Sequence, residues 1–253
     1  MVMCAENIRL EIVIIVTKLL AIETTEKCGS VAVSIDGKIL LHKELPDGQR
    51  SAQSLVPTIQ AVLQQVDWPV KSLDAVAVAL GPGSFTGLRI GLATARTLAY
   101  SVCAKLIGVN TLQAIAANVC LAMVDKQTIT AAIDAQRGEV SAQTFRLIQS
   151  QHFTGELYPE PVDERRLLTF AAWWELANDD STLGFIGPIL SKIVARKPEN
   201  VQLLDESQWS PNAVGVSRIA WERLLSGESD DLLTLQPYYS RPSAAEEKKG
   251  MQI

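Results

Sequence analysis

One segment, residues 73–102, constrains the fold more than any other part of the chain. Residues 73–80 (LDAVAVAL) are an almost unbroken apolar run, which is typical of a strand buried on both faces of its sheet. The turn Gly81-Pro82-Gly83 ends this run, and a helix is predicted from Phe85 to Val102. A buried strand that leads through a glycine turn into a helix is typical of α/β proteins.

The chain before this segment predicts three strands and a first helix. Residues 19–25 (LLAIETT) form the first strand, and Asp36-Gly37 separates two alternating runs as a hairpin turn does. Residues 53–66 repeat apolar side chains at helical spacing and therefore predict an amphipathic helix. With a further strand at 105–110, the order of the first half is β-β-β-α-β-α-β.

The second half gives weaker signals. The polar stretch Gln149–Glu164 contains two prolines, so an irregular surface connection is predicted there. The other predicted elements are a helix at 112–123, two strands around a turn at Arg137-Gly138, a strand that ends at Gly187-Pro188, a strand at 201–204 and a helix at 212–225.

These elements predict four parts of the chain. They are an N-terminal extension (1–17), a first lobe (18–110), a second, smaller lobe (111–236) and a C-terminal tail (237–253), whose charged end is predicted to be mobile.

Charge and cysteine usage restrict the partners and the compartment. With 23 Lys and Arg against 28 Asp and Glu, the net charge of −5 has the wrong sign for a protein that follows a phosphate backbone alone. The apolar run at residues 12–16 is too short to cross a membrane. The four cysteines form no CxxC pair, which favours a reduced, cytoplasmic setting: Cys4, Cys28, Cys103 and Cys120.

Two turns could bind phosphate. Gly81, Gly83 and Ser84 precede a helix N-terminus, where free amides and the helix dipole favour an anion. Thr24 and Thr25 follow the first strand, at the edge where open α/β sheets bind ligands. The chain has no Walker or GxGxxG motif, so an ordinary tight turn and an ordinary hydroxyl-rich strand end remain open alternatives.

No nucleophile with a paired base is recognisable. The chain has no GxSxG elbow, and His42 and His152 are interpreted as ordinary histidines of a strand and a polar connection. Asp134 and Glu139 flank the turn between two strands, where they face either an interlobe cleft or solvent.

The predicted helix at 85–102 has a smooth face. Gly87, Gly91 and Ala95 recur every four residues, and glycine costs a helix about 1 kcal/mol relative to alanine, so a closely packed neighbour is expected. That neighbour is either the chain's own sheet or a helix of a partner.

Several of these segments together resemble one family. LLAIETT, GPGSFTGLRIGLATARTLA, IGVNTL, AAIDAQRGEV and the late PYYSRP are similar to the TsaB family, the dimerization subunit of the bacterial threonylcarbamoyladenosine complex. The resemblance is dense over residues 19–140 and thin over 149–236. It implies a two-lobed α/β fold of the actin-like, sugar kinase and Hsp70 (ribonuclease H-like) class, with duplicated β-β-β-α-β-α-β units and a cleft between the lobes.

The resemblance also implies a function. TsaB proteins are non-catalytic scaffold subunits that pair with TsaD and TsaE, and the complex modifies N6 of adenosine 37 in tRNAs that read ANN codons. The catalytic paralogue TsaD holds a metal with two histidines four residues apart, and Thr111 and Ile115 occupy these positions here. Isoleucine cannot coordinate a metal. We therefore expect no catalytic residue, metal or cofactor in this chain, with ATP or ADP and the metal held by partner subunits, and contact with tRNA only through the complex.

The resemblance places the partner interface on the first-lobe helices, at about 52–66 and 85–102. The chain departs from the family pattern at Ser51-Ala52, where a His-Ser pair is usual, and at Glu23, where Asp is usual. A homodimer of the isolated chain remains open. The interface is predicted to use Leu55, Ile59, Leu63, Phe85, Leu88, Gly91, Leu92 and Ala95, and vestigial nucleotide loops are predicted at Thr24, Thr25, Gly81, Gly83 and Ser84.

The alternative class is an enzyme that acts alone. A stand-alone ATP-dependent kinase of this fold would need a base such as Asp134, and a metallopeptidase of the glycoprotease-like family would need metal ligands that this sequence lacks.

Overall fold

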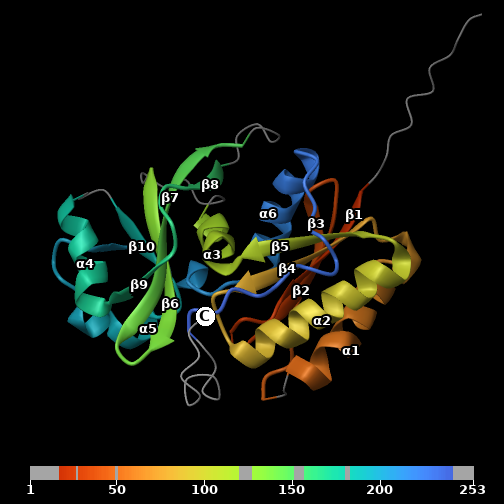
Figure 1. Cartoon of the computed structure of the whole chain (residues 1–253), viewed down its shortest axis with the longest axis horizontal. Coiled ribbons are helices and arrows are strands. Elements are labelled where there is room, and N and C mark those ends of the chain that lie inside the picture. The colour runs from red at the N-terminus through yellow and green to blue at the C-terminus, as the bar shows by residue number, and fades with distance from the viewer. Residues whose placement is uncertain are drawn as a thin grey trace, which may run out of the picture.

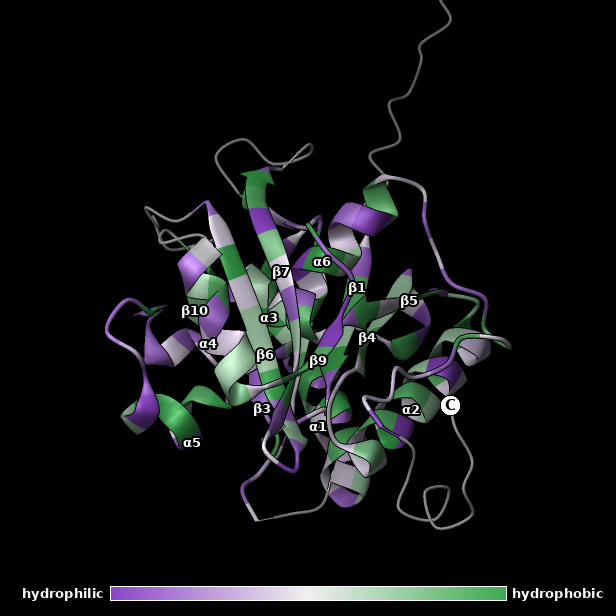
Figure 2. Ribbon diagram, turned by 60° about the vertical axis from the view of Figure 1, so that its left-hand side comes forward, coloured by the Kyte–Doolittle hydropathy of each residue, from purple (hydrophilic) through white to green (hydrophobic). Residues whose placement is uncertain are grey.

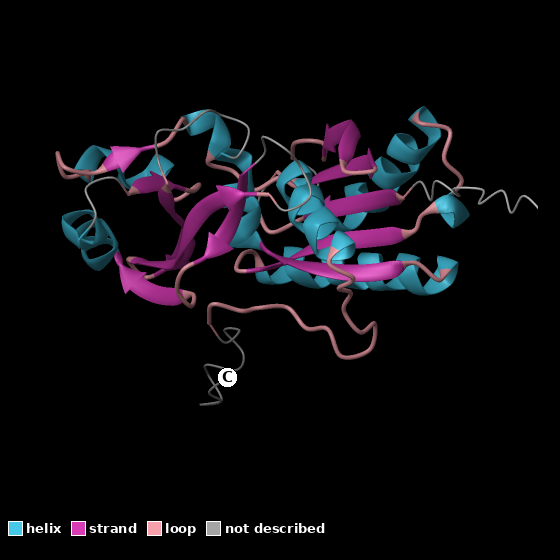
Figure 3. Ribbon diagram, turned by 90° about the horizontal axis from the view of Figure 1, so that it is seen from above, coloured by secondary structure: helices cyan, strands magenta, loops and turns pink. Residues whose placement is uncertain are grey.

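Two β-sheets with helices packed on them and between them make up the molecule (Figures 1 and 3). The computed structural model of the chain describes residues 17–26, 28–48, 51–119, 127–150, 157–179 and 183–241. The predicted extension 1–17 lies outside the described residues except for Thr17.

The first sheet has the strand order β3-β2-β1-β4-β5. Its strands β1, β4 and β5 are parallel, while β2 and β3 are antiparallel and form the predicted hairpin, with positive φ at Asp36 (48°) and Gly37 (78°). All seven residues of β4 are buried, as predicted from the unbroken apolar run. The bounds are β1 Lys18–Glu23, β2 Ser30–Ile35, β3 Lys38–Glu44, β4 Ala75–Gly81 and β5 Lys105–Asn110.

Helices α1 (Ser51–Gln65) and α2 (Phe85–Val102) cover one face of this sheet side by side (Figure 1). The predicted bounds of α2 are confirmed, and its two ends have clear local causes. Ser84 caps the N-terminus by accepting a hydrogen bond from Gly87 N (3.2 Å). Cys103 ends the helix in the left-handed region, at φ 56°. A short 3₁₀ turn, η1 (Val70–Ser72), leads from α1 into β4.

The second sheet repeats the topology of the first. Its order is β11-β10-β6-β7-β8, with three parallel strands at one side, two antiparallel strands at the other, and β9 paired to β7. The interior strand β6 is largely hydrophobic (Figure 2). The elements are β6 Thr128–Gln136, β7 Glu139–Gln149, β8 Leu157–Pro161, β9 Arg166–Thr169, α4 Phe170–Asp179, β10 Gly184–Ile186, α5 Leu190–Ile193, η2 Val194–Arg196, β11 Gln202–Leu203 and η3 Glu206–Gln208.

Two helices cross between the lobes. α3 (Thr111–Val119) packs against strands of the second sheet, and α6 (Ala213–Leu225) returns to the free face of the first sheet. The two helices touch closely, since a Cβ on Gly215 would overlap the carbonyl oxygen of Ala114. Residues 111–236 were predicted to form the second lobe, but their last helix packs on the first lobe.

The predicted irregular connection at 149–164 is partly wrong. Residues 157–161 form β8, in which Pro159 pairs with Leu147 and Pro161 with Phe145. Because β8 is the terminal strand in the order of its sheet, its prolines interrupt no pairing with another strand. His152 and residues 120–126, which include the predicted end of the helix at Met123, lie outside the described residues.

The first part of the predicted C-terminal tail (237–253) contacts both lobes. Tyr238 N donates to Leu80 O (2.7 Å), and Arg241 forms an ion pair with Glu139. Residues 242–253 lie outside the described residues.

Candidate functional site

The loop after β1 and the turn after β4 meet at the N-terminus of α2. Thr24 Oγ1 donates to Gly87 O (2.8 Å), and Ser84 N donates to Thr25 O (2.7 Å). A Cβ on Gly83 would overlap Thr25. The structure therefore brings together the five residues predicted as vestigial nucleotide loops, but the Thr24 hydroxyl and the Ser84 amide already donate to backbone carbonyl groups.

Glu23 ends β1 beneath this loop and is fully buried, at 0% exposure. Its Oε1 accepts hydrogen bonds from Thr25 N and Thr25 Oγ1, both at 2.5 Å, while Oε2 has no partner among the described residues. Burial raises the pKa of Glu23 to about 8, although the two bonds from Thr25 act against this shift. The carboxyl is therefore largely protonated at neutral pH and supplies little negative charge for a cation.

The predicted interface residues of α1 and α2 lie inside the first lobe. Apart from Phe85, which is half-buried, all of them are buried in the first lobe. A Cβ on Gly91 would overlap Thr24 Oγ1 and reach Val78, so the smooth face of α2 packs on β1 and β4. This burial counts against the predicted residue assignment, because the apolar stripe of an amphipathic helix is its core face. The buried residues are Leu55, Ile59, Leu63, Leu88, Gly91, Leu92 and Ala95.

The outward faces of the same helices have an unusual composition. Among their exposed residues, only Arg89 is charged, and Tyr100 is 75% exposed. Surface helices normally carry charges on this face, and depletion of charge with enrichment of tyrosine is the signature of a protein interface. We call this surface the outer face of α1 and α2, defined by Ala52, Gln53, Val56, Pro57, Gln60, Gln64, Gln65, Thr86, Arg89, Ala93, Thr97, Tyr100 and Ser101.

Thr111 and Ile115 of α3 are both fully buried. Thr111 Oγ1 accepts a hydrogen bond from Gly81 N (3.1 Å), and Ile115 belongs to the core of the second lobe. Thr111 thus stabilises the turn after β4, and Ile115 fills the core of the second lobe. In the described part of the chain, no cluster of three or more His, Cys, Asp or Glu side chains is arranged to hold a metal.

The two carboxylates at the β6–β7 hairpin are engaged by cations. Asp134 binds Lys192 Nζ (2.7 Å) and accepts a bond from Gln136 N (2.7 Å), and Glu139 pairs with Arg241. His42 lies exposed on β3, where burial of part of its ring lowers its pKa. None of these residues forms a nucleophile–base pair.

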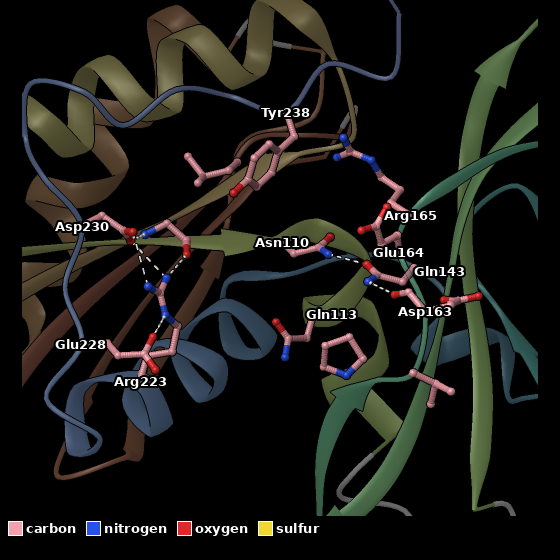
Figure 4. A pocket seen from close by; sticks show the side chains of 14 residues that line it. Asn110, Gln113, Gln143, Asp163, Glu164, Arg165, Arg223, Glu228, Asp230 and Tyr238 are labelled. Atoms are coloured by element: carbon pink, nitrogen blue, oxygen red, sulfur yellow. Dashed lines mark hydrogen bonds and ion pairs between the residues drawn. The ribbon is translucent and has the colours of Figure 1, made fainter.

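A cavity of about 960 Å³ opens between the lobes (Figure 4). Asn110 at the end of β5 donates to Gln143 Oε1 (2.6 Å), whose own amide donates to Asp163 O (2.8 Å). Tyr238 forms the wall above, with the Arg165 guanidinium 5.2 Å from its ring centre. Four carboxylates against two arginines line the cavity, so it disfavours phosphate groups: Asp163, Glu164, Glu228, Asp230, Arg165 and Arg223.

The resemblance implied a cleft between the lobes, but the sequence did not show which residues line this cavity. Its lining comes from β5, β7, the β8–β9 connection, α6 and the C-terminal segment, which only the fold brings together. The one trace in the sequence was PYYSRP, which contains Tyr238.

Comparisons with known proteins agree on one assignment. The chain is 29% identical over 236 residues to the tRNA threonylcarbamoyladenosine biosynthesis protein TsaB of Escherichia coli K12, which covers 91% of this chain and 97% of that protein. It is 28% identical over 228 residues to TsaB of Haemophilus influenzae, covering 88% and 93%. The structure of YeaZ from Pseudomonas aeruginosa matches with a TM-score of 0.73 at 26% identity, covering 88% of this chain and 99% of that chain.

These similarities support assignment of the chain to the TsaB/YeaZ proteins. A family model described as TsaD, tRNA N6-adenosine threonylcarbamoyltransferase, matches residues 48–166. This stretch contains α1 and α2, so the outer face of α1 and α2 lies in the part that matches the transferase family model. The two-lobed α/β fold expected for a TsaB/YeaZ protein is confirmed by the two sheets and by the likeness to the YeaZ structures. No helix in the described part of this TsaB/YeaZ chain is long and apolar enough to span a membrane.

Proposed function

We propose that this chain is the non-catalytic accessory subunit of a complex that attaches a threonylcarbamoyl group to N6 of adenosine 37 in tRNAs that read ANN codons. In this proposal a TsaD-type transferase is the direct partner and a TsaE-type ATPase joins them. The names of the TsaB relatives and the TsaD family match support a place in this pathway. ATP or ADP and the metal belong to the partners, and tRNA contacts this acidic chain only through the complex.

The observation that carries this proposal is the outer face of α1 and α2. A surface of glutamines, small residues and one exposed tyrosine costs little to desolvate, because almost no charge must leave water. Its small side chains, such as Ala93 and Ala52, permit a partner helix to approach at ordinary helix-packing distance. Without the transferase, the same face is offered to a second copy of the chain.

A stand-alone kinase or peptidase is disfavoured by what the candidate groups contact. A base would have to lie in the cleft, yet Asp134 is paired with Lys192, accepts a bond from Gln136 N and does not line the interlobe cavity. In the loops that would hold phosphate, Thr24 Oγ1 and Ser84 N already donate to backbone carbonyl oxygens, so these two donors are not available to an anion.

Substitution of Ala93 by arginine tests the outer face. Ala93 is exposed near the middle of α2, so we expect the variant to keep the wild-type melting temperature within about 2 °C, as for a typical surface change. Affinity for the TsaD-type transferase should fall by about 100-fold, because a charge without a partner would be buried in the interface. Isothermal titration calorimetry with the purified transferase measures this change.

Leu225 supplies a matched control. It is 45% exposed on α6, which packs on the opposite face of the first sheet from α1 and α2. Leu225→Arg should therefore bind the transferase with wild-type affinity. Equal affinities of the Ala93→Arg variant and the wild type would remove the outer face from the proposal.

A further inference from the structure

The first part of segment 228–241 runs along the surface of the first lobe (Figures 1 and 3). Asp230 N donates to Leu106 O (2.8 Å), and Gly108 N donates to Asp230 Oδ2 (2.7 Å). These bonds satisfy the open edge of β5, which ends the first sheet. Leu235 packs against the core under α2. The segment is thus anchored to the first lobe before it reaches the second.

The next residues attach to the C-terminal end of β4 and to the first turn of α2. Tyr238 N donates to Leu80 O (2.7 Å). The Tyr239 ring lies 4.7 Å from the Phe85 ring, and Arg89 Nε donates to the Tyr239 hydroxyl (3.1 Å). Tyr238 therefore binds the end of β4, and the adjacent Tyr239 packs on α2.

The same short stretch also contacts the second lobe. Arg241 forms an ion pair with Glu139 at the start of β7, with the two side chains 22% and 31% exposed. The Arg165 guanidinium, from the β8–β9 connection, lies over the Tyr238 ring. These contacts join positions far apart in the sequence, and they cross the junction beside the interlobe cavity that Tyr238 lines.

We propose that residues 237–241 are a strap that fixes the angle between the two lobes, and that its release lets the lobes separate around the interlobe cavity. The strap holds one end on the first lobe by a main-chain hydrogen bond and aromatic packing, and the other end on the second lobe by an ion pair. The ion pair between Arg241 and Glu139 contributes less stabilisation than the contacts to the first lobe, because it is partly exposed to solvent. The strap is a property of the chain itself and does not depend on the proposed function.

The angle is measured on the isolated, full-length chain with two spin labels. The labels are placed at exposed positions 71 in the first lobe and 196 in the second, with the native cysteines replaced by serine. Double electron–electron resonance should give one narrow distance distribution for the wild type. In Arg241→Glu, two carboxylates face each other, and we expect the population of separated lobes to rise on the order of tenfold. The double variant Glu139→Arg with Arg241→Glu restores opposite charges and should restore the narrow distribution.

Two truncated chains test the strap independently, and one of them serves as the control. A chain that ends at residue 241 keeps the strap and should behave like the full chain. A chain that ends at residue 236 lacks it and should show a broader, longer distribution. Unchanged distances in Arg241→Glu and in the shorter truncation would overturn the proposal. So would a double variant that stays broad, or a chain ending at 241 that is as broad as the one ending at 236.

Discussion

Gly87→Ala should destabilise the chain by about 3 kcal/mol or more, although the same change in an exposed helix stabilises by about 1 kcal/mol. A Cβ at residue 87 would overlap the carbonyl oxygen of Thr24, which is backbone and cannot rotate away. Either α2 must move off β1, or the loop after β1 must break its bond from Thr24 Oγ1 to Gly87 O. Urea denaturation followed by circular dichroism measures the change in the free energy of unfolding.

The neighbouring residue provides the control for this variant. Thr86 is exposed on the same turn of α2, so Thr86→Ala should leave the free energy of unfolding within about 0.5 kcal/mol of the wild type. If Gly87→Ala were as stable as Thr86→Ala, the close contact between α2 and the β1 loop would be wrong.

Glu23→Gln should abolish a large pH dependence of stability. Burial raises the pKa of Glu23 from 4.5 to about 8, so between these values the native chain retains a proton that the unfolded chain has lost. The native state of the wild type is therefore favoured below pH 4.5, and this stabilisation is lost as the pH rises to 8. The loss amounts to roughly 3–5 kcal/mol.

Glutamine mimics the neutral carboxyl and has no proton to lose. The amide oxygen of the substituted side chain can still accept the bonds from Thr25, so Glu23→Gln should match the wild type near pH 5 and exceed its stability at pH 9. Urea denaturation of both proteins at pH 5, 7 and 9 gives the comparison. Parallel stability curves for the two proteins would show that the carboxyl is ionised or solvated in the native state.

Local chemistry made the first half of the fold predictable. Asp36-Gly37 is a hairpin turn because both residues adopt positive φ, and the apolar run of β4 is buried along its whole length. Ser84 as a cap and Cys103 in the left-handed region explain why the predicted bounds of α2 are the observed ones. Each of these signals depends on neighbouring residues only, so the sequence carried it in full.

The sequence could not decide which side of α1 and α2 faces a partner and which side packs in the core. An apolar stripe that includes Leu55, Leu88 and Ala95 must pack against another apolar surface. Periodicity does not show whether that surface is the chain's own sheet or a helix of a partner protein. The structure assigns the stripe to the core, and the informative signal was the near absence of charge, with Arg89 as the single exception, on the opposite side of the same helices. Glycines spaced by four also indicated close packing, and the partner of that packing was the β1 loop.

Long-range contacts could not be predicted from the sequence for a different reason. Arg241 meets Glu139, and Asn110 meets Gln143, only because the chain crosses between two lobes. Pro159 and Pro161 are turn formers by local preference, yet β8 takes them at the edge of a sheet. In each case the tertiary neighbour decided the structure.

Reconstitution of tRNA modification tests the central claim most directly. The purified chain is mixed with a TsaD-type transferase, a TsaE-type ATPase, a donor of the threonylcarbamoyl group and unmodified tRNA, and threonylcarbamoyladenosine is measured after digestion to nucleosides. We expect product with the wild-type chain, almost none when it is omitted or replaced by Ala93→Arg, and none from the chain alone. Equal product without the chain, or product formed by the chain without the transferase, would contradict its role as an accessory subunit.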